Sequence, residues 1–195
     1  MATSGRQEKW DVFGAAMNLR ILIADDEPII RMGLKSMLQE MGHSVTAASN
    51  GREALRMARN RVFDLAILDV KMPYTDGLQA AKVLSAKHGL PIILLTAYSE
   101  QDLIEQASEL PIQGYLVKPV QTRQLAAAIA VAHKRHADAA EQGQELEARK
   151  VIERAKGKLM AGGMSEVQAH RAIQRRAREQ RRSMVEIARR LLDDA

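Results

Sequence analysis

The chain has 195 residues and a formal net charge of +5, and its 46% hydrophobic and 27% charged content is typical of a folded globular protein rather than a disordered or collagen-like one. It contains no cysteine, which excludes disulfides, thiolate metal centres and cysteine nucleophiles. No apolar run approaches the roughly 18 residues of a membrane span. We therefore expect a cytoplasmic protein without a membrane partner. Residues 1–18 lack a signal-peptide pattern and are expected to form a disordered N-terminal arm.

Residues 19–133 alternate short apolar runs with segments of helical periodicity, which is typical of parallel strands joined by crossover helices. Near-continuous apolar character predicts strands that helices cover on both faces of the sheet. The fold class expected here is α/β, with a doubly wound, five-stranded parallel sheet. The expected strands are 20–24, 44–48, 65–68, 92–95 and 114–117.

A very long helix is expected at residues 122–161, where proline is absent and Ala, Glu, Gln, Lys, Arg and Leu predominate. A weak heptad spacing from Leu125 to Leu146 favours either a coiled coil or a solvated linker helix. Gly143 is the position where this helix is expected to bend or fray.

The tail is expected to form two more helices, each opened by a capping box. Ser165 with Gln168, and Ser183 with Glu186, have the required spacing of three residues. With the end of the long helix they make a small three-helix unit. Because this unit has few residues for a core, we expect it to lean on the long helix or on a partner copy.

Polar side chains stand at the carboxyl ends of the expected strands, where open α/β sheets bind ligands. Asp25 and Asp26 follow the first strand, Asp69 the third, Thr96 the fourth and Lys118 the fifth. Three crowded carboxylates without histidine or cysteine nearby favour Mg²⁺. Asp69 ends the most apolar strand, so it is the best candidate for a nucleophile toward a phosphoryl group.

The excess positive charge lies in the last third of the chain. Residues 1–133 hold 14 Lys and Arg against 14 Asp and Glu, and residues 134–195 hold 15 against 10. At 100° per residue, Arg171, Arg175, Arg178 and Arg182 would fall within about 60° of one another on a helix, which predicts a polyanion-binding stripe. The scarcity of aromatic residues favours folded RNA over single strands.

Four segments of residues 19–133 resemble the receiver domain of two-component response regulators: ILIADDEP, DLAILDVKMPYTDG, PIILLTA and GYLVKP. The resemblance implies a flavodoxin-like fold in which Asp69 accepts a phosphoryl group from a sensor histidine kinase. It also implies that Asp26, Asp69 and the backbone carbonyl of Lys71 hold Mg²⁺ with help from Asp25. Thr96 and Lys118 would contact the phosphoryl oxygens, Tyr115 would be the switch aromatic, and the Lys118–Pro119 bond would be cis.

Residues 153–192 resemble the ANTAR output domain, an RNA-binding module of transcription antitermination regulators, through AKGKLM, SEVQA and SMVEIA. The sequence departs from that family at His170 and at residues 176–178, RAR, where the family more often has an aromatic residue and smaller or apolar residues. The candidate RNA contacts are Lys156, Lys158, Arg171, Arg175, Arg178 and Arg182.

Together these features predict a non-enzymatic response regulator whose domains are a receiver at 19–133, a helical connector at 134–152 and an ANTAR-type domain at 153–195. Phosphorylation would promote a homodimer that binds hairpin RNA. Two alternatives stay open: a DNA-binding regulator with a helix-turn-helix-like tail, and an aspartate-nucleophile phosphatase. The phosphatase would need an acid two residues after Asp69, where Lys71 stands.

Overall fold

A computed structural model describes residues 18–73, 75–97 and 112–193, so the arm expected at residues 1–18 lies almost wholly outside the described residues. The chain forms two compact units, the first ending at His136 and the second beginning at Ala137. One helix, α5 (Thr122–Ala161), contributes residues to both units.

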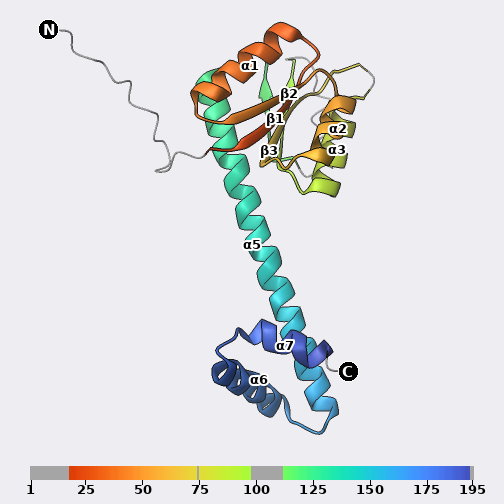
Figure 1. Ribbon diagram of the computed structural model, residues 1–195, viewed down its shortest axis with the longest axis vertical. Coiled ribbons are helices and arrows are strands. Elements are labelled where there is room, and N and C mark those ends of the chain that lie inside the picture. Colours follow the sequence, from red (N-terminus) through yellow and green to blue (C-terminus); the bar gives the residue numbers. More distant parts are fainter. Residues whose placement is uncertain (1–17, 74, 98–111, 194–195) are drawn as a thin grey trace, which may run out of the picture. The chain divides into compact units, whose positions relative to one another are not determined.

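The first unit is built on a five-stranded sheet in which every neighbouring pair is parallel, in the order β2-β1-β3-β4-β5 (Figure 1). This confirms the predicted fold class. The strands are β1 (Arg20–Ala24), β2 (Ser44–Ala48), β3 (Leu65–Asp69), β4 (Ile92–Thr96) and β5 (Gly114–Val117).

Helices cover both faces of this sheet. On one face, α1 (Pro28–Glu40) and the first turns of α5 bury Leu34, Leu38, Leu125 and Ile129 against Ile21 and its neighbours. On the other face, α2 (Gly51–Asn60) and α3 (Gly77–His88) bury small side chains, among them Ala54, Ala58, Ala80 and Ala81. Burial of apolar residues on both faces explains why the strands carry no polar alternation.

Local signals set the helix starts. Pro28 occupies the first turn of α1, where its missing N–H costs nothing. The Asn50 side chain accepts a hydrogen bond from the Glu53 N–H at the start of α2, and the Asp76 side chain accepts one from the Leu78 N–H at the start of α3. These caps fix the loops that lead away from the carboxyl edge of the sheet.

Two sequence expectations need correction in detail. Strands β3 and β4 each extend one residue further than expected and include Asp69 and Thr96, because Asp69 pairs in register with Leu95, and Thr96 with Val117. The long helix has the expected bounds, but it continues through Gly143 without interruption.

The second unit packs α6 (Glu166–Gln180) and α7 (Met184–Asp193) on the last turns of α5. Both predicted capping boxes form: Ser165 with Gln168, and Ser183 with Glu186. The expectation that the tail leans on the long helix is confirmed. Its buried core consists of Val151, Ala155, Ile173, Ala177, Ile187 and Ala188.

Candidate functional site: an acidic pocket and a basic helix

The sheet brings the predicted acidic residues together. Asp25, Asp26 and Asp69 each offer a carboxylate oxygen, and these atoms lie within 4.8 Å of one another. Lys118 follows β5 and reaches into the same place, with its Nζ 2.8 Å from Asp25 Oδ2 and 3.1 Å from Asp69 Oδ1. Three carboxylates facing one ammonium leave two negative charges, which fits a divalent, oxygen-binding cation such as Mg²⁺.

Asp25 is the most enclosed of the three acids, because its side chain is fully buried. Its Oδ1 accepts a hydrogen bond from the Glu27 N–H at 2.9 Å, and its backbone carbonyl accepts one from Arg31 Nη1 at 2.6 Å. The other carboxylate oxygen, Oδ2, is buried, and its contact is the ion pair with Lys118 Nζ. Asp26 is more accessible and has a carboxylate freer to take a metal ion.

The electrostatics of the pocket raise the pKa of the Asp69 carboxyl above its ordinary value. Burial raises the pKa of the Asp69 carboxyl, the hydrogen bond from Lys118 lowers it, and the charges of Asp25 and Asp26 raise it again. For Lys118, burial opposes the charged form, but hydrogen bonds to Asp25 and Asp69 outweigh it and the pKa of the ammonium is raised. Lysine therefore stays charged between the two acids.

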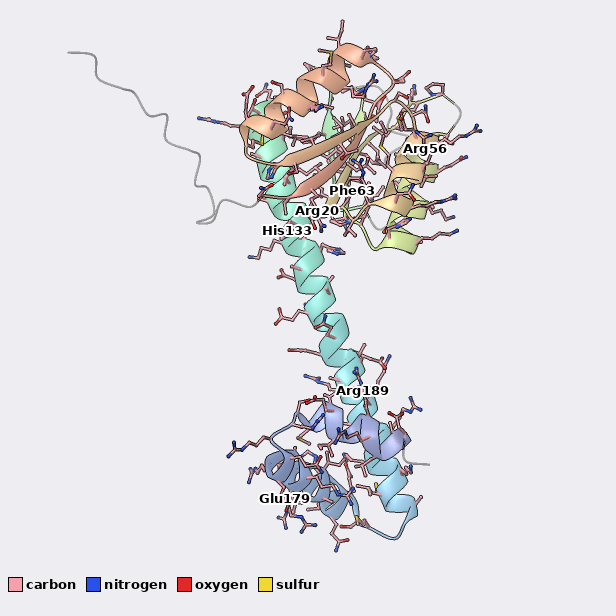
Figure 2. All side chains as sticks on the ribbon, in the orientation of Figure 1. Arg20, Arg56, Phe63, His133, Glu179 and Arg189 are labelled. Atoms are coloured by element: carbon pink, nitrogen blue, oxygen red, sulfur yellow. The ribbon has the colours of Figure 1, made fainter. Side chains whose placement is uncertain are left out.

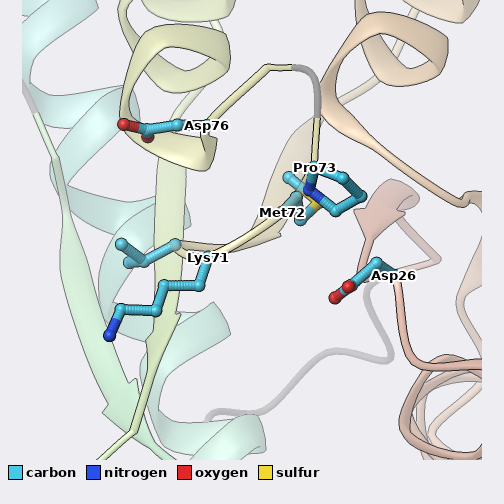
Figure 3. A pocket seen from close by; sticks show the side chains of 6 residues that line it. Asp26, Lys71, Met72, Pro73 and Asp76 are labelled. Atoms are coloured by element: carbon cyan, nitrogen blue, oxygen red, sulfur yellow. The ribbon is translucent and has the colours of Figure 1, made fainter.

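A cavity of about 460 Å³ opens beside this cluster, between Asp26 and the loop after β3. Lys71, Met72, Pro73 and Asp76 line it, and Figure 3 shows the Lys71 side chain extending away from the Asp26 carboxylate. The cavity offers room for a small anion and its donor next to the acids.

The remaining predicted residues lie where the topology places them. Thr96 ends β4, and its hydroxyl donates a hydrogen bond to the Ala97 carbonyl at 3.2 Å. Tyr115 on β5 is 56% exposed and points away from the core. The Lys118–Pro119 peptide bond is cis, as the resemblance implied.

Two glycines hold the loop after β3 in place: Gly51, which the sequence marks as a break between elements, and Gly77, which it does not single out. A Cβ on Gly77 would lie 1.9 Å from the backbone oxygen of Asp69, and a Cβ on Gly51 would lie 2.6 Å from the backbone oxygen of Thr75. The Gly77 N–H donates to the Val70 carbonyl at 2.9 Å. For Gly77 the only sequence signal is a glycine at the start of a helical segment.

In the second unit, Arg171, Arg175 and Arg178 are exposed along α6, opposite the buried Ala169 and Ile173. Arg175 Nε lies 3.9 Å from Glu179 Oε1, an exposed pair of small energetic weight.

Arg182 differs from the other three arginines because α6 ends at Gln180 and Arg181 adopts a left-handed conformation with φ 50°. It therefore stands in the turn before α7, not on the helical stripe that the sequence predicted. Its Nη1 lies 3.7 Å from Glu186 Oε1.

The two lysines of the AKGKLM segment are engaged inside the unit. Lys156 is 7% exposed, and its Nζ contacts Glu153 at 3.0 Å and Glu166 at 2.8 Å. The hydrogen bond to Glu166 is the main cause that raises the pKa of Lys156. Lys158 Nζ donates to the Leu191 carbonyl at 2.6 Å. These contacts tie α5 to the start of α6 and to the end of α7.

Comparison with known families decides the assignment. The response regulator receiver domain matches residues 21–130, and the ANTAR domain matches residues 141–192. The chain is a two-component response regulator. Receiver and ANTAR output together account for most of this response regulator, as the two resemblances in the sequence indicated.

Related transcriptional regulators agree with this assignment. The response regulator is 42% identical over 183 residues to the transcriptional regulatory protein PdtaR of Mycobacterium tuberculosis, with 89% of each chain covered. It is 36% identical over 108 residues to the transcriptional regulatory protein YdfI of Bacillus subtilis, covering 54% of this chain and 51% of that protein. Proteins that regulate transcription are thus similar to it over either both domains or the receiver alone.

Solved structures match the receiver. A response regulator receiver domain from Clostridium thermocellum aligns with TM-score 0.56 and 31% identity, covering 60% of this chain and 94% of that one. The chemotaxis response regulator CheY4 of Vibrio cholerae aligns with TM-score 0.55 and 29% identity, covering 60% and 99%. Within the described residues, no helix of the response regulator is both long and apolar enough to cross a membrane.

Proposed function

We propose that Asp69 accepts a phosphoryl group from a sensor histidine kinase. The observation that carries this proposal is a cluster of three carboxylates, whose oxygens lie within 4.8 Å of one another, with a lysine in contact with two of them and an open cavity beside them. Asp26, Asp69 and the Lys71 carbonyl would hold Mg²⁺, with Asp25 assisting through the contacts that fix it in place.

In the transfer, an Asp69 carboxylate oxygen attacks phosphorus, the phosphorus–nitrogen bond of the phosphohistidine breaks, and the histidine leaves with the bonding electron pair. Lys118, 3.1 Å from Asp69 Oδ1, is placed to neutralise charge on the transferring oxygens. Mg²⁺, when bound, supplies the remaining positive charge there. The Thr96 hydroxyl would turn from the Ala97 carbonyl toward the new phosphoryl oxygens.

The test is phosphoryl incorporation from acetyl phosphate, measured by intact mass spectrometry on native protein and two matched variants. Asp69→Asn should abolish incorporation, because it removes the nucleophilic oxygen at nearly constant volume. Asp76→Asn is the control, since it lines the same cavity and asparagine keeps the helix cap. Equal incorporation in Asp69→Asn and native protein would remove Asp69 from this role.

We further propose that the phosphorylated protein forms a homodimer that binds hairpin RNA and acts in transcription antitermination. Support comes from the ANTAR match and from the exposed Arg171, Arg175 and Arg178, since guanidinium groups suit phosphates and the shape of folded RNA. Arg182 would add a contact from the turn. Lys156 and Lys158 would act mainly by holding the three helices together.

A gel-shift comparison tests the output. Arg175→Glu with Arg178→Glu reverses two charges and should weaken hairpin RNA binding and flatten its salt dependence. Lys35→Glu with Lys134→Glu is the matched control, because both lysines are exposed on the receiver unit. If duplex DNA competes as well as hairpin RNA, the helix-turn-helix alternative replaces this proposal. Sedimentation with and without acetyl phosphate tests the dimer, which should appear only with the donor.

A further inference from the structure

The outer surface of α2 and α3, on the receiver, carries almost a single sign of charge. Residues 51–63 and 77–90 contain six Lys and Arg and one acid, Glu53. All six are exposed, and Figure 2 shows nitrogen-tipped side chains projecting from these helices away from the sheet, Arg56 among them. We call this surface the α2–α3 basic face. Its cations are Arg52, Arg56, Arg59, Arg61, Lys82 and Lys87.

These cations are largely unneutralised. Arg56 Nη2 lies 3.4 Å from Glu53 Oε1, and among residues 18–73, 75–97 and 112–193 the other five have no ion-pair partner. A solvated helix face normally mixes both signs. Helix α1, on the opposite face of the sheet, does so, with Arg31, Lys35 and Glu40. The receiver sequence is charge-balanced overall, so this face is a local concentration of positive charge.

A cleft of about 370 Å³ lies within the basic face, at the carboxyl ends of α2 and α3. Arg59, Arg61 and His88 line it over an apolar floor that includes Phe63. Val62 also lines the cleft and is 69% exposed. The cleft thus offers two guanidinium groups on a concave surface rather than on a flat charged plane.

We propose that the α2–α3 basic face binds the phosphate backbone of the same RNA that the output domain holds, an inference that rests on the proposed RNA function. Arg52, Arg56 and Arg59 follow one another over about 10 Å of helix, whereas a nucleic-acid duplex carries roughly one charge per 1.7 Å of its axis. One RNA stem therefore offers several phosphates to this row of cations.

RNA is favoured over an acidic protein or a membrane because the output domain is part of the same chain. An RNA bound there is present at high local concentration around the receiver, so weak phosphate contacts gain effect without high intrinsic affinity. Contacts of this kind carry no base specificity. The receiver would increase the affinity for RNA and lengthen the stretch of RNA that the protein covers, while the output domain selects the RNA.

The experiment measures binding of full-length protein to a short hairpin RNA, and to the same hairpin with a longer stem, over a series of salt concentrations. Arg59→Ala with Lys87→Ala removes one cation from each helix of the face. Lys35→Ala with Lys134→Ala removes two exposed cations elsewhere on the receiver unit and is the control. Each phosphate contact contributes about 0.7 to 0.9 to the salt slope. The loss of two contacts should therefore lower the slope by about 1.4 to 1.8 and weaken binding of the longer stem about 25- to 60-fold at 0.1 M salt.

The outcomes separate the two proposals. If native protein binds neither hairpin, the proposed RNA function itself is wrong. If native protein binds and both variants behave alike, whether unchanged or equally weakened, the basic face is not an RNA surface. The same variants are also mixed with phosphatidylserine vesicles. If the test variant binds both hairpins as the control does but loses vesicle binding, the face belongs to a membrane partner and the proposal is overturned.

Discussion

Lys118 is expected to be the residue on which the stability of the acidic pocket depends most. Its ammonium is the cation paired with Asp25 and Asp69, whose side chains are 0% and 8% exposed. Lys118→Met keeps the aliphatic stem but leaves two buried carboxylates without a counter-charge. Breaking a buried ion pair in this way lowers the free energy of unfolding by ~3–5 kcal/mol. Because 15% of the lysine side chain is exposed, we expect the free energy of unfolding to fall by about 3 kcal/mol, near the lower end of that range.

The loss of stability in Lys118→Met should be larger at neutral pH than at acidic pH. Burial already raises the pKa of Asp69, and Lys118 is the group that lowers it, so the variant should raise that pKa further. A folded state that holds the proton more tightly loses stability as pH rises through that pKa. The deficit of Lys118→Met should therefore shrink as the pH falls from neutral toward the ordinary aspartate pKa of 3.8, and added Mg²⁺ should restore part of it.

Amide hydrogen exchange of β1 and β3 measures this, because those amides open with the receiver core. Lys35→Met serves as the control, since Lys35 is an exposed lysine on α1. A loss of similar size in Lys35→Met, or a Lys118→Met deficit that grows as the pH falls, would refute the reasoning that unpaired buried carboxylates are the cause.

Three further outcomes are expected. Asp26→Ala should lose Mg²⁺ binding in a calorimetric titration, because too few free carboxylates remain to replace the waters of the ion; unchanged affinity would place the metal elsewhere. Asp69→Asn should stabilise the metal-free protein at neutral pH in chemical denaturation, because the buried carboxylate has a raised pKa and its charge is costly there; a less stable variant would contradict this. Ile173→Ala should destabilise the output unit by ~2–5 kcal/mol, since Ile173 is fully buried in its core, and RNA binding should fall while acetyl phosphate labelling stays intact.

The fold was largely predictable because its signals are local. Apolar runs marked each strand, and the absence of proline marked α5, whose bounds agree with the expectation. The acidic cluster was also predictable, because parallel strands bring their carboxyl ends to one edge. The residues Asp25, Asp26, Asp69, Thr96 and Lys118 all lie at that edge.

The details that sequence reasoning missed depend on tertiary contacts. Lys156 looked like a free cation, but its partner Glu166 is ten residues away and comes close only when α6 folds back on α5. Arg182 looked helical because nothing but the Ser183 cap signals the end of α6. The left-handed residue there is Arg181, where glycine is usual. Because arginine rarely adopts this conformation, the sequence does not predict that α6 ends here.

The glycines at the loop after β3 constrain how the receiver can respond to its signal. Gly77 holds the far end of that loop against the backbone of Asp69, and Gly51 leaves room for the carbonyl of Thr75. A loop tethered at its base has little freedom to swing as a whole. Any rearrangement around a modified Asp69 must therefore pass outward through side chains and neighbouring strands. Saturation mutagenesis should accordingly find position 77 intolerant of every other amino acid, while exposed positions of the same loop accept many.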